Sequence, residues 1–428
     1  MKRKAGKHLI FAVTWITYAG FYFCRKNLSI ALPLLHKQGG LPSFELANIV
    51  FGYSLLYAVG QFTCGLMSDW FGPARIVGTG LLLIVASNLL ITLHTWPVWL
   101  LAFACLNGAG QSTGWSGLVK IMGNWFSGGE RGVVMAWWST NYVLGGFLAT
   151  TFATWAVAQH FLAPQWGWRR GFIFPALVVL AIAILFFLFS QDSPRDSGEE
   201  YSSALSGERF QFTDMLDLLR HRGIWSIGIS YFFLEMCRYA LLFWLPYYMV
   251  NRLRFGVAES GYVSSLYELV GIIGALIAGY VSDRFLESRR APVSAVMLLG
   301  FGAIMLLEMK LSHDGVLGMA IVVALAGLLT YGPDTLLSGA GAQDIGQRKT
   351  TATASGLIDG IGHLGALISP YLVVLVSQRY GWDRLFLAFM AAAILSAAAL
   401  TPIWNLRPAD EHSALNAPAA LETSANGR

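Results

Sequence analysis

The sequence predicts an all-α membrane protein of twelve transmembrane helices in two pseudo-symmetric six-helix bundles. Three observations lead to this prediction: the composition, the recurrence of long apolar runs, and a repeat between the two halves of the chain. Of the 428 residues, 55% are hydrophobic and only 12% are charged, roughly half the charge of a soluble domain. A chain of this size has too little polar surface to hide twelve apolar helices from water.

The apolar runs recur along the whole chain at lengths that suit a bilayer. A helix of about 20 apolar residues crosses the hydrocarbon core, and a longer run can tilt or reach beyond the headgroups. The predicted spans lie near 9–35, 47–68, 75–95, 97–121, 133–158, 171–190, 224–250, 260–282, 292–310, 315–340, 351–376 and 384–404.

Short motifs return at a nearly constant offset in the second half. The Cys-Arg pair that contains Arg25 returns 213 residues later at Arg238. Asp69 in GLMSDWFG returns 214 residues later as Asp283 in GYVSDRFL. The repeat implies two bundles related by a pseudo-twofold axis along the membrane normal, a transporter plan that holds substrate at the midplane between the halves.

One long polar stretch divides the repeats and sets the predicted domains. They are an N-terminal six-helix bundle (1–190), a cytoplasmic linker (191–222), a C-terminal six-helix bundle (223–404) and a cytoplasmic tail (405–428). The tail is polar and rich in small residues, which predicts disorder.

Basic residues orient the chain in the membrane. With the N-terminus in the cytoplasm, 17 basic residues in predicted loops and helix ends lie inside and 8 lie outside, which the positive-inside rule favours. The first apolar run is too long for a cleavable signal peptide, and the four cysteines show neither metal nor disulfide spacing. We therefore expect a multi-pass protein of the inner (plasma) membrane with both termini cytoplasmic, and attribute the formal charge of +5 to orientation instead of nucleic-acid binding.

Two arginines at membrane depth predict an anion site. Ionisable residues there are expensive and commonly functional. Arg25 and Arg238 are repeat mates, so the pseudo-twofold places them across from each other at the centre. Facing guanidiniums repel unless an anion lies between them, and arginine binds phosphate or carboxylate in a fork. Lys26 points about 100° away from Arg25, either toward a neighbouring helix or outward to the headgroups.

Polar pairs on two later helices leave alternatives open. Glu235 lies three residues before Arg238, on the same helix face; it either neutralises the arginine or acts as a gate that substrate or a proton releases. Asp359 and His363 lie four residues apart. They form either a proton relay or a polar pair that fixes helix packing.

Further carboxylates are candidates for gating or proton coupling. Asp334 follows a helix-breaking Gly-Pro pair, and Glu268 suits a structural partner of another helix. Asp69 and Asp283 end the second and eighth spans, where they can pair with arginines or meet a helix N-terminus and so latch one end of the protein. Glycines four residues before each aspartate are expected to permit close helix packing.

Several segments together resemble the organophosphate:phosphate antiporters of the major facilitator superfamily, which carry glycerol 3-phosphate, hexose phosphates and phosphoglycerates. They are CRKNLSIALPLL, STGWSGLVKIMGNWFSGGERG, CRYALLFWLPYY, SLYELVGIIG and TYGP. The resemblance runs nearly end to end, and the loops with Asp69 and Asp283 resemble the superfamily's signature loop. It implies the major facilitator fold, a rocker-switch mechanism and phosphoryl binding by Arg25 and Arg238, with Tyr331 of TYGP near the site.

The chain departs from that family at residues around the arginines. Gln61 stands where those transporters generally have a lysine, and Asn141 stands where the glycerol-phosphate carriers have a histidine. Glu235 and His363 each replace a tyrosine. We count Gln61, Asn141 and His363 as candidate substrate-binding residues. The departures leave room for a phosphate ester with a cationic part, for another organic anion, or for coupling to protons.

The sequence therefore predicts a monomeric secondary transporter that exchanges an organic phosphate for inorganic phosphate. Its expected partners are the small anionic substrate and the lipid bilayer, without a cofactor or metal. The alternatives are a proton-coupled transporter of another organic anion or drug, and a transporter-like sugar-phosphate sensor. We find no Walker loop, metal-ligand cluster or nucleophile elbow in the sequence, so we do not expect an enzyme.

Overall fold

The computed structural model describes residues 6–126, 134–135, 137–159, 161–193, 218–311 and 315–406, without the side chains of 62, 66, 69, 343 and 346–353. Every named element in this part is a helix. The first half contains α1 (Lys7–Lys37), α2 (Ser43–Phe71), α3 (Pro73–Leu90), α4 (Pro97–Gln111), α5 (Thr113–Trp125), α7 (Thr140–Ala158), η1 (Pro164–Arg169) and α8 (Arg170–Phe189). The second half contains α10 (Arg222–Asn251), α11 (Val257–Phe285), α12 (Arg290–Leu311), α13 (Gly315–Thr335), the π-helical η3 (Leu336–Gly341), α14 (Ala342–Tyr380), α15 (Trp382–Ala399) and η4 (Thr401–Ile403).

Each of the twelve predicted spans overlaps one described helix or two consecutive ones. Within the described residues, eight helical stretches are individually long and apolar enough to cross a membrane. α4 and α5 are too short singly, at 15 and 13 residues, but follow each other across Ser112. Most of the predicted linker, 194–217, and of the predicted tail, 407–428, lies outside the described residues.

Proline and glycine set several helix ends. Pro73 and Pro97 open α3 and α4, at positions where a missing backbone N–H leaves no hydrogen bond unmade. Gly72 and Gly381, both with φ near +88°, join α2 to α3 and α14 to α15. A side chain at that φ would be strained, so glycine allows each pair of helices to be joined by a single residue.

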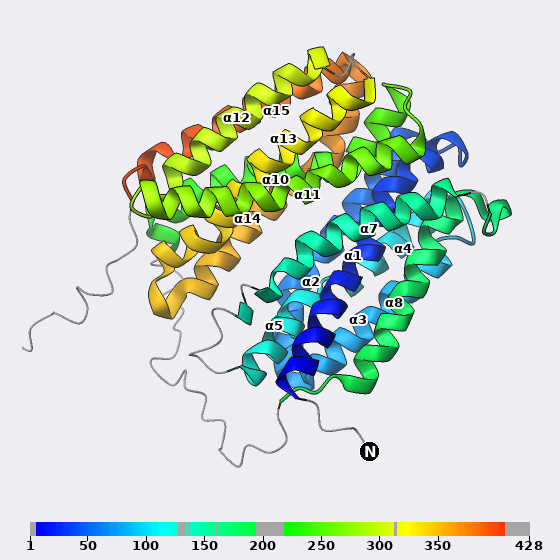
Figure 1. The fold of residues 1–428 in the computed structure, drawn as a ribbon, viewed down its shortest axis with the longest axis horizontal. Coiled ribbons are helices and arrows are strands. Elements are labelled where there is room, and N and C mark those ends of the chain that lie inside the picture. Colours follow the sequence, from blue (N-terminus) through cyan, green and yellow to red (C-terminus); the bar gives the residue numbers. More distant parts are fainter. Residues whose placement is uncertain are drawn as a thin grey trace, which may run out of the picture.

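The two bundles repeat the same helix packing. In the first, α1 packs on α7, α2 on α4 and α3 on α8; in the second, α10 packs on α14, α11 on α13 and α12 on α15. Figure 1 shows them as two separate bundles, the first coloured from blue to green and the second from green to red. The predicted pseudo-symmetric architecture is confirmed.

Close helix approaches repeat as well. A Cβ on Gly108 of α4 would meet the backbone carbonyl of Tyr53 on α2, and a Cβ on Gly327 of α13 would meet that of Tyr267 on α11. Tyr53 and Tyr267 are 214 residues apart, the offset of the loop motifs. Glycine is thus required at the same crossing in both bundles, because only its missing side chain lets the backbones come this close.

The bundles share an apolar core only toward the end away from the N-terminus. One cluster of buried side chains combines the last part of α1 with α10, while the clusters nearer the N-terminal end each stay within one bundle. Polar contacts follow the same division: Ser43 Oγ lies 2.7 Å from Tyr247 Oη, and the Tyr371 hydroxyl donates to Asn48 Oδ1 at 3.0 Å. In Figure 1 the bundles converge at that end and diverge toward the N-terminus.

Candidate functional site

Arg25 is a buried cation that lies between aromatic rings. It lies on α1 with 9% of its surface exposed. Its guanidinium carbon is 4.6 Å from the ring centre of Tyr57 and 4.8 Å from that of Tyr22. Among the described residues no carboxylate pairs with it, and its Nε and Nη2 atoms have no hydrogen-bond partner. These aromatic faces stabilise the cation and leave donors available to an anion.

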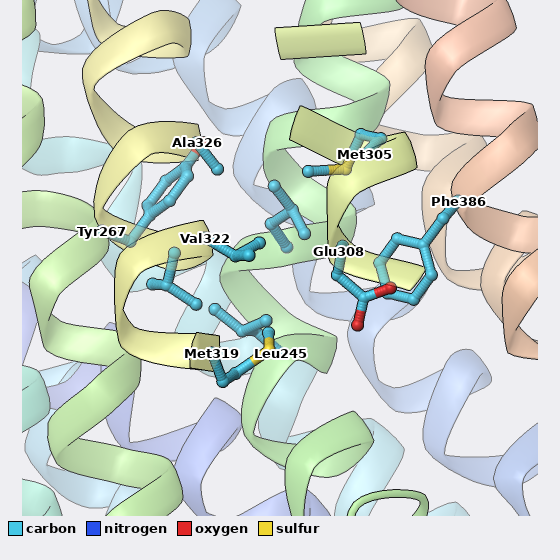
Figure 2. Close-up of a pocket in the computed structure, with 10 residues that line it drawn as sticks. Leu245, Tyr267, Met305, Glu308, Met319, Val322, Ala326 and Phe386 are labelled. Atoms are coloured by element: carbon cyan, nitrogen blue, oxygen red, sulfur yellow. The ribbon is translucent and has the colours of Figure 1, made fainter. Parts of the chain in front are cut away.

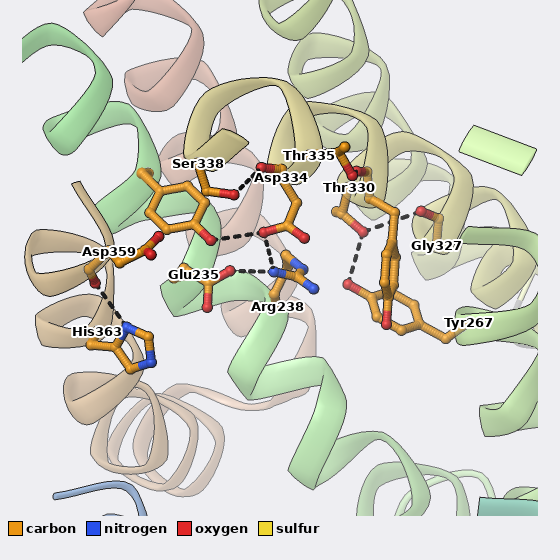
Figure 3. A network of polar contacts seen from close by, with 12 residues as sticks. Glu235, Arg238, Tyr267, Gly327, Thr330, Asp334, Thr335, Ser338, Asp359 and His363 are labelled. Carbon is orange, nitrogen blue, oxygen red and sulfur yellow. Dashed lines mark hydrogen bonds and ion pairs between the residues drawn. The ribbon is translucent and has the colours of Figure 1, made fainter. Parts of the chain in front are cut away.

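Arg238, the repeat mate on α10, lies in the opposite environment. Its Nη1 pairs with Glu235 one turn away and with Asp334 Oδ1 of α13 at 2.6 Å, as Figure 3 shows. The Tyr231 hydroxyl donates to the same Asp334 oxygen at 2.8 Å, and the Tyr331 ring lies 4.8 Å from the guanidinium carbon. The charge of Arg238 is therefore already satisfied by the protein.

An aromatic ring supports each arginine, but from different helices. Tyr57, which supports Arg25, would have its repeat mate at Gly271. A Cβ on Gly271 would meet the ring of Tyr331, which supports Arg238. A tyrosine of α13 thus occupies in the second bundle the place that a tyrosine of α2 occupies in the first. Tyr331 thus lies beside Arg238, and its part in substrate binding stays a prediction.

His363 on α14 contacts the backbone of Asp359 and not its carboxylate. Nδ1 lies 2.8 Å from the Asp359 carbonyl oxygen, so the carboxylate–imidazole pair considered from the sequence is not formed. The Asp359 carbonyl lies one helical turn before His363 and is within reach of the ring, whereas the Asp359 carboxylate points away from it (Figure 3). Nδ1 must donate to the carbonyl, which leaves buried Nε2 as an acceptor in the neutral ring, and Nε2 has no partner. The centre of the His363 ring lies 5.8 Å from the ring centre of Tyr57 and 6.1 Å from that of Tyr239.

Lys26 faces a neighbouring helix of the other bundle. It forms a buried ion pair and hydrogen bond with Glu268 of α11, and the two residues are 2% and 3% exposed. Of the two orientations considered for Lys26, the one toward a neighbouring helix is found. Glu268 is its structural partner, and this contact joins the bundles at membrane depth.

The two remaining predicted substrate-binding residues, Gln61 and Asn141, differ in whether they connect to the surroundings of Arg25. Gln61 Nε2 donates to the Tyr57 hydroxyl at 2.6 Å, which links it to the aromatic support of Arg25. Asn141 on α7 is completely buried, and both polar atoms of its amide lack a partner. No contact within the described residues joins Asn141 to either arginine.

The signature-loop carboxylates lie apart from this centre. Asp283 pairs with Arg290 at the start of α12, and Arg290 Nε also reaches Asp344 Oδ2 at 3.4 Å. Burial raises the pKa of the Asp344 carboxyl, and the Arg290 guanidinium opposes that change. The side chain of Asp69 lies outside the described residues. A Cβ at the glycine four residues before either aspartate would meet no atom of the described residues within 4 Å, so the expected close packing is not found in this part of the structure.

Sequence reasoning missed the tyrosines around the site. Tyr22 and Tyr57 contact Arg25, Tyr239 contacts His363, and Tyr231 binds Asp334. For Tyr22, Tyr231 and Tyr239 the signal in the sequence was a spacing of three or four residues from Arg25 or Glu235 on the same helix, whereas Tyr57 on α2 had no such signal. Tyrosine is too common near membrane interfaces for that spacing alone to stand out.

Two small pockets adjoin the site without containing the arginines. The pocket in Figure 2 lies inside the second bundle and is mostly apolar, with Glu308 hydrogen-bonded to Tyr248 at its edge. A second pocket lies between the bundles. It is lined by Ser29 and Thr150 from the first and by Leu241, Leu242, Leu245, Ser264, Tyr267 and Glu268 from the second.

The chain matches the Major Facilitator Superfamily model over residues 14–358. It is 29% identical to the glycerol-3-phosphate transporter of Bacillus subtilis (strain 168) over 94% of this chain and 93% of that protein. It is 26% identical to a probable hexose phosphate transport protein of Chlamydia muridarum, over 92% and 90%. It is also 26% identical to the glucose-6-phosphate exchanger SLC37A2 of Mus musculus, over 90% of each chain.

Solved structures agree on the fold. The chain superposes on a bacterial homologue of the human lysosomal transporter Spinster, inward-facing and occupied, with a TM-score of 0.78, 13% identity and coverage of 93% of this chain and 96% of that one. The resemblance to organophosphate:phosphate antiporters is confirmed by these relatives. Because the family and the named relatives are transporters, the prediction of a transporter and not an enzyme is confirmed as well. The chain belongs to the Major Facilitator Superfamily.

Proposed function

We propose that this protein is a secondary transporter that exchanges an organic phosphate for inorganic phosphate by alternating access. The observation that carries the proposal is Arg25, a buried guanidinium with two unpartnered nitrogens and no acidic partner in the described structure. A buried, uncompensated charge is costly, and a phosphoryl group offers the paired oxygens that a guanidinium binds best. The phosphate-ester substrates in the relatives' names support the same class.

In this mechanism the site lies between the bundles and faces the N-terminal end. The shared apolar core closes the opposite end, and the Lys26–Glu268 pair holds the bundles together beside the site. An entering phosphoryl group binds Arg25 and competes with the carboxylates for Arg238. Because a ligand shifts a conformational equilibrium only by its differential affinity, the anion favours the state in which both arginines reach it.

We also propose that the protein acts as a monomer in the inner (plasma) membrane, with both termini in the cytoplasm. The excess of basic residues in loops on the N-terminal side supports this orientation. The divergent end of the bundles then opens to the cytoplasm.

The test is uptake of labelled phosphate into phosphate-loaded liposomes that contain the purified protein. Exchange should occur with the wild type and fall at least about tenfold in Arg25→Lys, because lysine cannot form the forked contact. Arg379→Lys, at an exposed arginine of α14, is the matched control and should exchange normally. Absence of wild-type exchange, or an unchanged rate in Arg25→Lys, rejects the proposal.

Proton-coupled transport of an organic anion is the second candidate. Three carboxylates, Glu235, Asp334 and Asp359, accompany the single guanidinium of Arg238, and such a group can carry a proton. This candidate predicts uptake driven by an acidic exterior into vesicles that contain no phosphate. Phosphate antiport predicts none under those conditions.

A further inference from the structure

The charges of the two half-sites do not match. Arg25 in the first bundle has no carboxylate partner within the described residues, whereas Arg238 in the second has both Glu235 and Asp334. Lys26 of the first bundle and Glu268 of the second neutralise each other as a pair, so neither is left uncompensated. The first half-site is therefore cationic and the second is anionic.

Asp359 increases the anionic excess of the second half-site. It is half-buried on α14, and its carboxylate forms neither an ion pair nor a hydrogen bond among the described residues. It is close enough to Asp334 and Glu235 for mutual repulsion. Glu235 and Asp334 contact the guanidinium of Arg238, and Asp359 lies further out, on the side of His363 (Figure 3). The second half-site thus holds three carboxylates and one guanidinium, an arrangement that is unfavourable at membrane depth unless further positive charge arrives.

A second observation indicates what kind of positive charge fits. The buried Nε2 of His363, one helical turn from Asp359, is an acceptor with no partner. The rings of Tyr57 and Tyr239 flank this imidazole. An ammonium group has only donors to offer and is attracted to aromatic faces. Carboxylate, imidazole acceptor and tyrosine rings together form a suitable environment for it.

We propose that the transported substrate is zwitterionic: a phosphate or phosphonate that carries an ammonium group. This inference rests on the proposed function and narrows its substrate class. The phosphoryl group binds Arg25 of the first bundle, and the ammonium group binds Asp359 and the neighbouring carboxylates of the second. The ammonium also weakens the hold of Glu235 and Asp334 on Arg238, which frees that guanidinium to join Arg25 on the phosphoryl oxygens.

The test compares two ligands of nearly equal shape, 2-aminoethyl phosphate and n-propyl phosphate, which differ by an ammonium in place of a methyl group. Binding to the purified full-length protein is measured by calorimetry. The wild type should bind 2-aminoethyl phosphate at least about tenfold more tightly, the scale of one hydrogen bond to a charged group. That ratio should fall to near one in Asp359→Asn and persist in Asp359→Glu, which keeps the charge.

Asp383→Asn, at an exposed aspartate of α15, is the control and should keep the wild-type ratio. Equal binding of the two ligands by the wild type, failure to bind either, or an undiminished ratio in Asp359→Asn overturns the inference. If Asp359→Asn does not fold, the wild-type ratio still decides the outcome. Phosphate exchange in liposomes tests the proposed function separately: exchange without an ammonium preference rejects only the zwitterion.

Discussion

Lys26 of α1 and Glu268 of α11 form a buried ion pair across the boundary between the two bundles. Of the ion pairs found among the described residues, it alone joins the bundles. Loss of one partner leaves a bare charge at membrane depth, whereas loss of both leaves no unpaired charge. The pair is therefore more important for specifying how the halves meet than for net stability.

Single and double substitutions of this pair should differ in the size of their effect on stability. Lys26→Met and Glu268→Gln should each destabilise the folded protein by about 3–5 kcal/mol, and the double variant should recover most of that loss. Asp283→Asn breaks the exposed pair with Arg290 and should change stability by less than about 1 kcal/mol. Thermal unfolding in detergent measures all four. A double variant less stable than either single one would contradict the prediction.

The two arginines should respond differently to removal of their charge. Arg25→Gln leaves no carboxylate unpaired, so the melting temperature should hold while phosphate affinity falls about 100-fold or more. Arg238→Gln leaves Glu235 and Asp334 without their cation and should destabilise the protein by about 3–5 kcal/mol. Adding Asp334→Asn should restore stability but not binding. Calorimetry and thermal unfolding together check this, and equal stability losses in the two single variants would argue against the asymmetry.

A disulfide across the closed end should stop transport. A Cβ on Gly261 of α11 would lie 2.8 Å from the Cβ of Thr154 on α7, and a disulfide needs about 3.5–4.5 Å, a small adjustment. In a background with the four native cysteines replaced, oxidised Thr154→Cys/Gly261→Cys should lose phosphate exchange, and a reductant should restore it. Each single cysteine variant is the control. Continued exchange by the cross-linked protein would show that this end need not open.

The glycine crossings should tolerate no side chain. Gly108→Val and Gly327→Val place methyl groups against the carbonyls of Tyr53 and Tyr267 and should each lower stability by about 1–3 kcal/mol through overpacking. Gly279→Ala on α11, where a Cβ meets nothing within 4 Å, should be close to wild type. Thermal unfolding tests the set. A similar small change in all three would indicate that the crossings relax without strain.

The architecture was predictable because it depends on properties that hydropathy and repeats record directly. Apolar runs located the spans, and the offset of Asp69 and Asp283 revealed the two bundles. Helix ends were less accurate: the span predicted at 75–95 ends at Leu90, because the apolar residues that follow form a turn before α4. Hydropathy does not distinguish a helix from a turn: Ile91 and Thr92 are buried and Leu93 is exposed, and none of the three is helical.

The partners of the charged residues were less accessible to sequence reasoning. Glu268 lies 242 residues from Lys26, and helix spacing relates only residues within a few turns. Local spacing also gave a wrong partner for His363. A spacing of four residues brings both the side chain and the backbone carbonyl of Asp359 within reach, and the imidazole contacts the carbonyl. The matching positions of the two arginines in the two bundles could be expected from the repeat, but their unlike surroundings depend on Asp334, which comes from a different helix.

The apolar core that both bundles share has a consequence for the membrane gradient. An empty carrier must separate that core to turn around, and it gains no ligand contact in return. Under the proposed exchange mechanism, we therefore expect reorientation without cargo to be rare, so that little phosphate leaks down its gradient in unpaired steps. One-for-one counterflow would then follow from side-chain packing, without any dedicated chemical step to count the molecules.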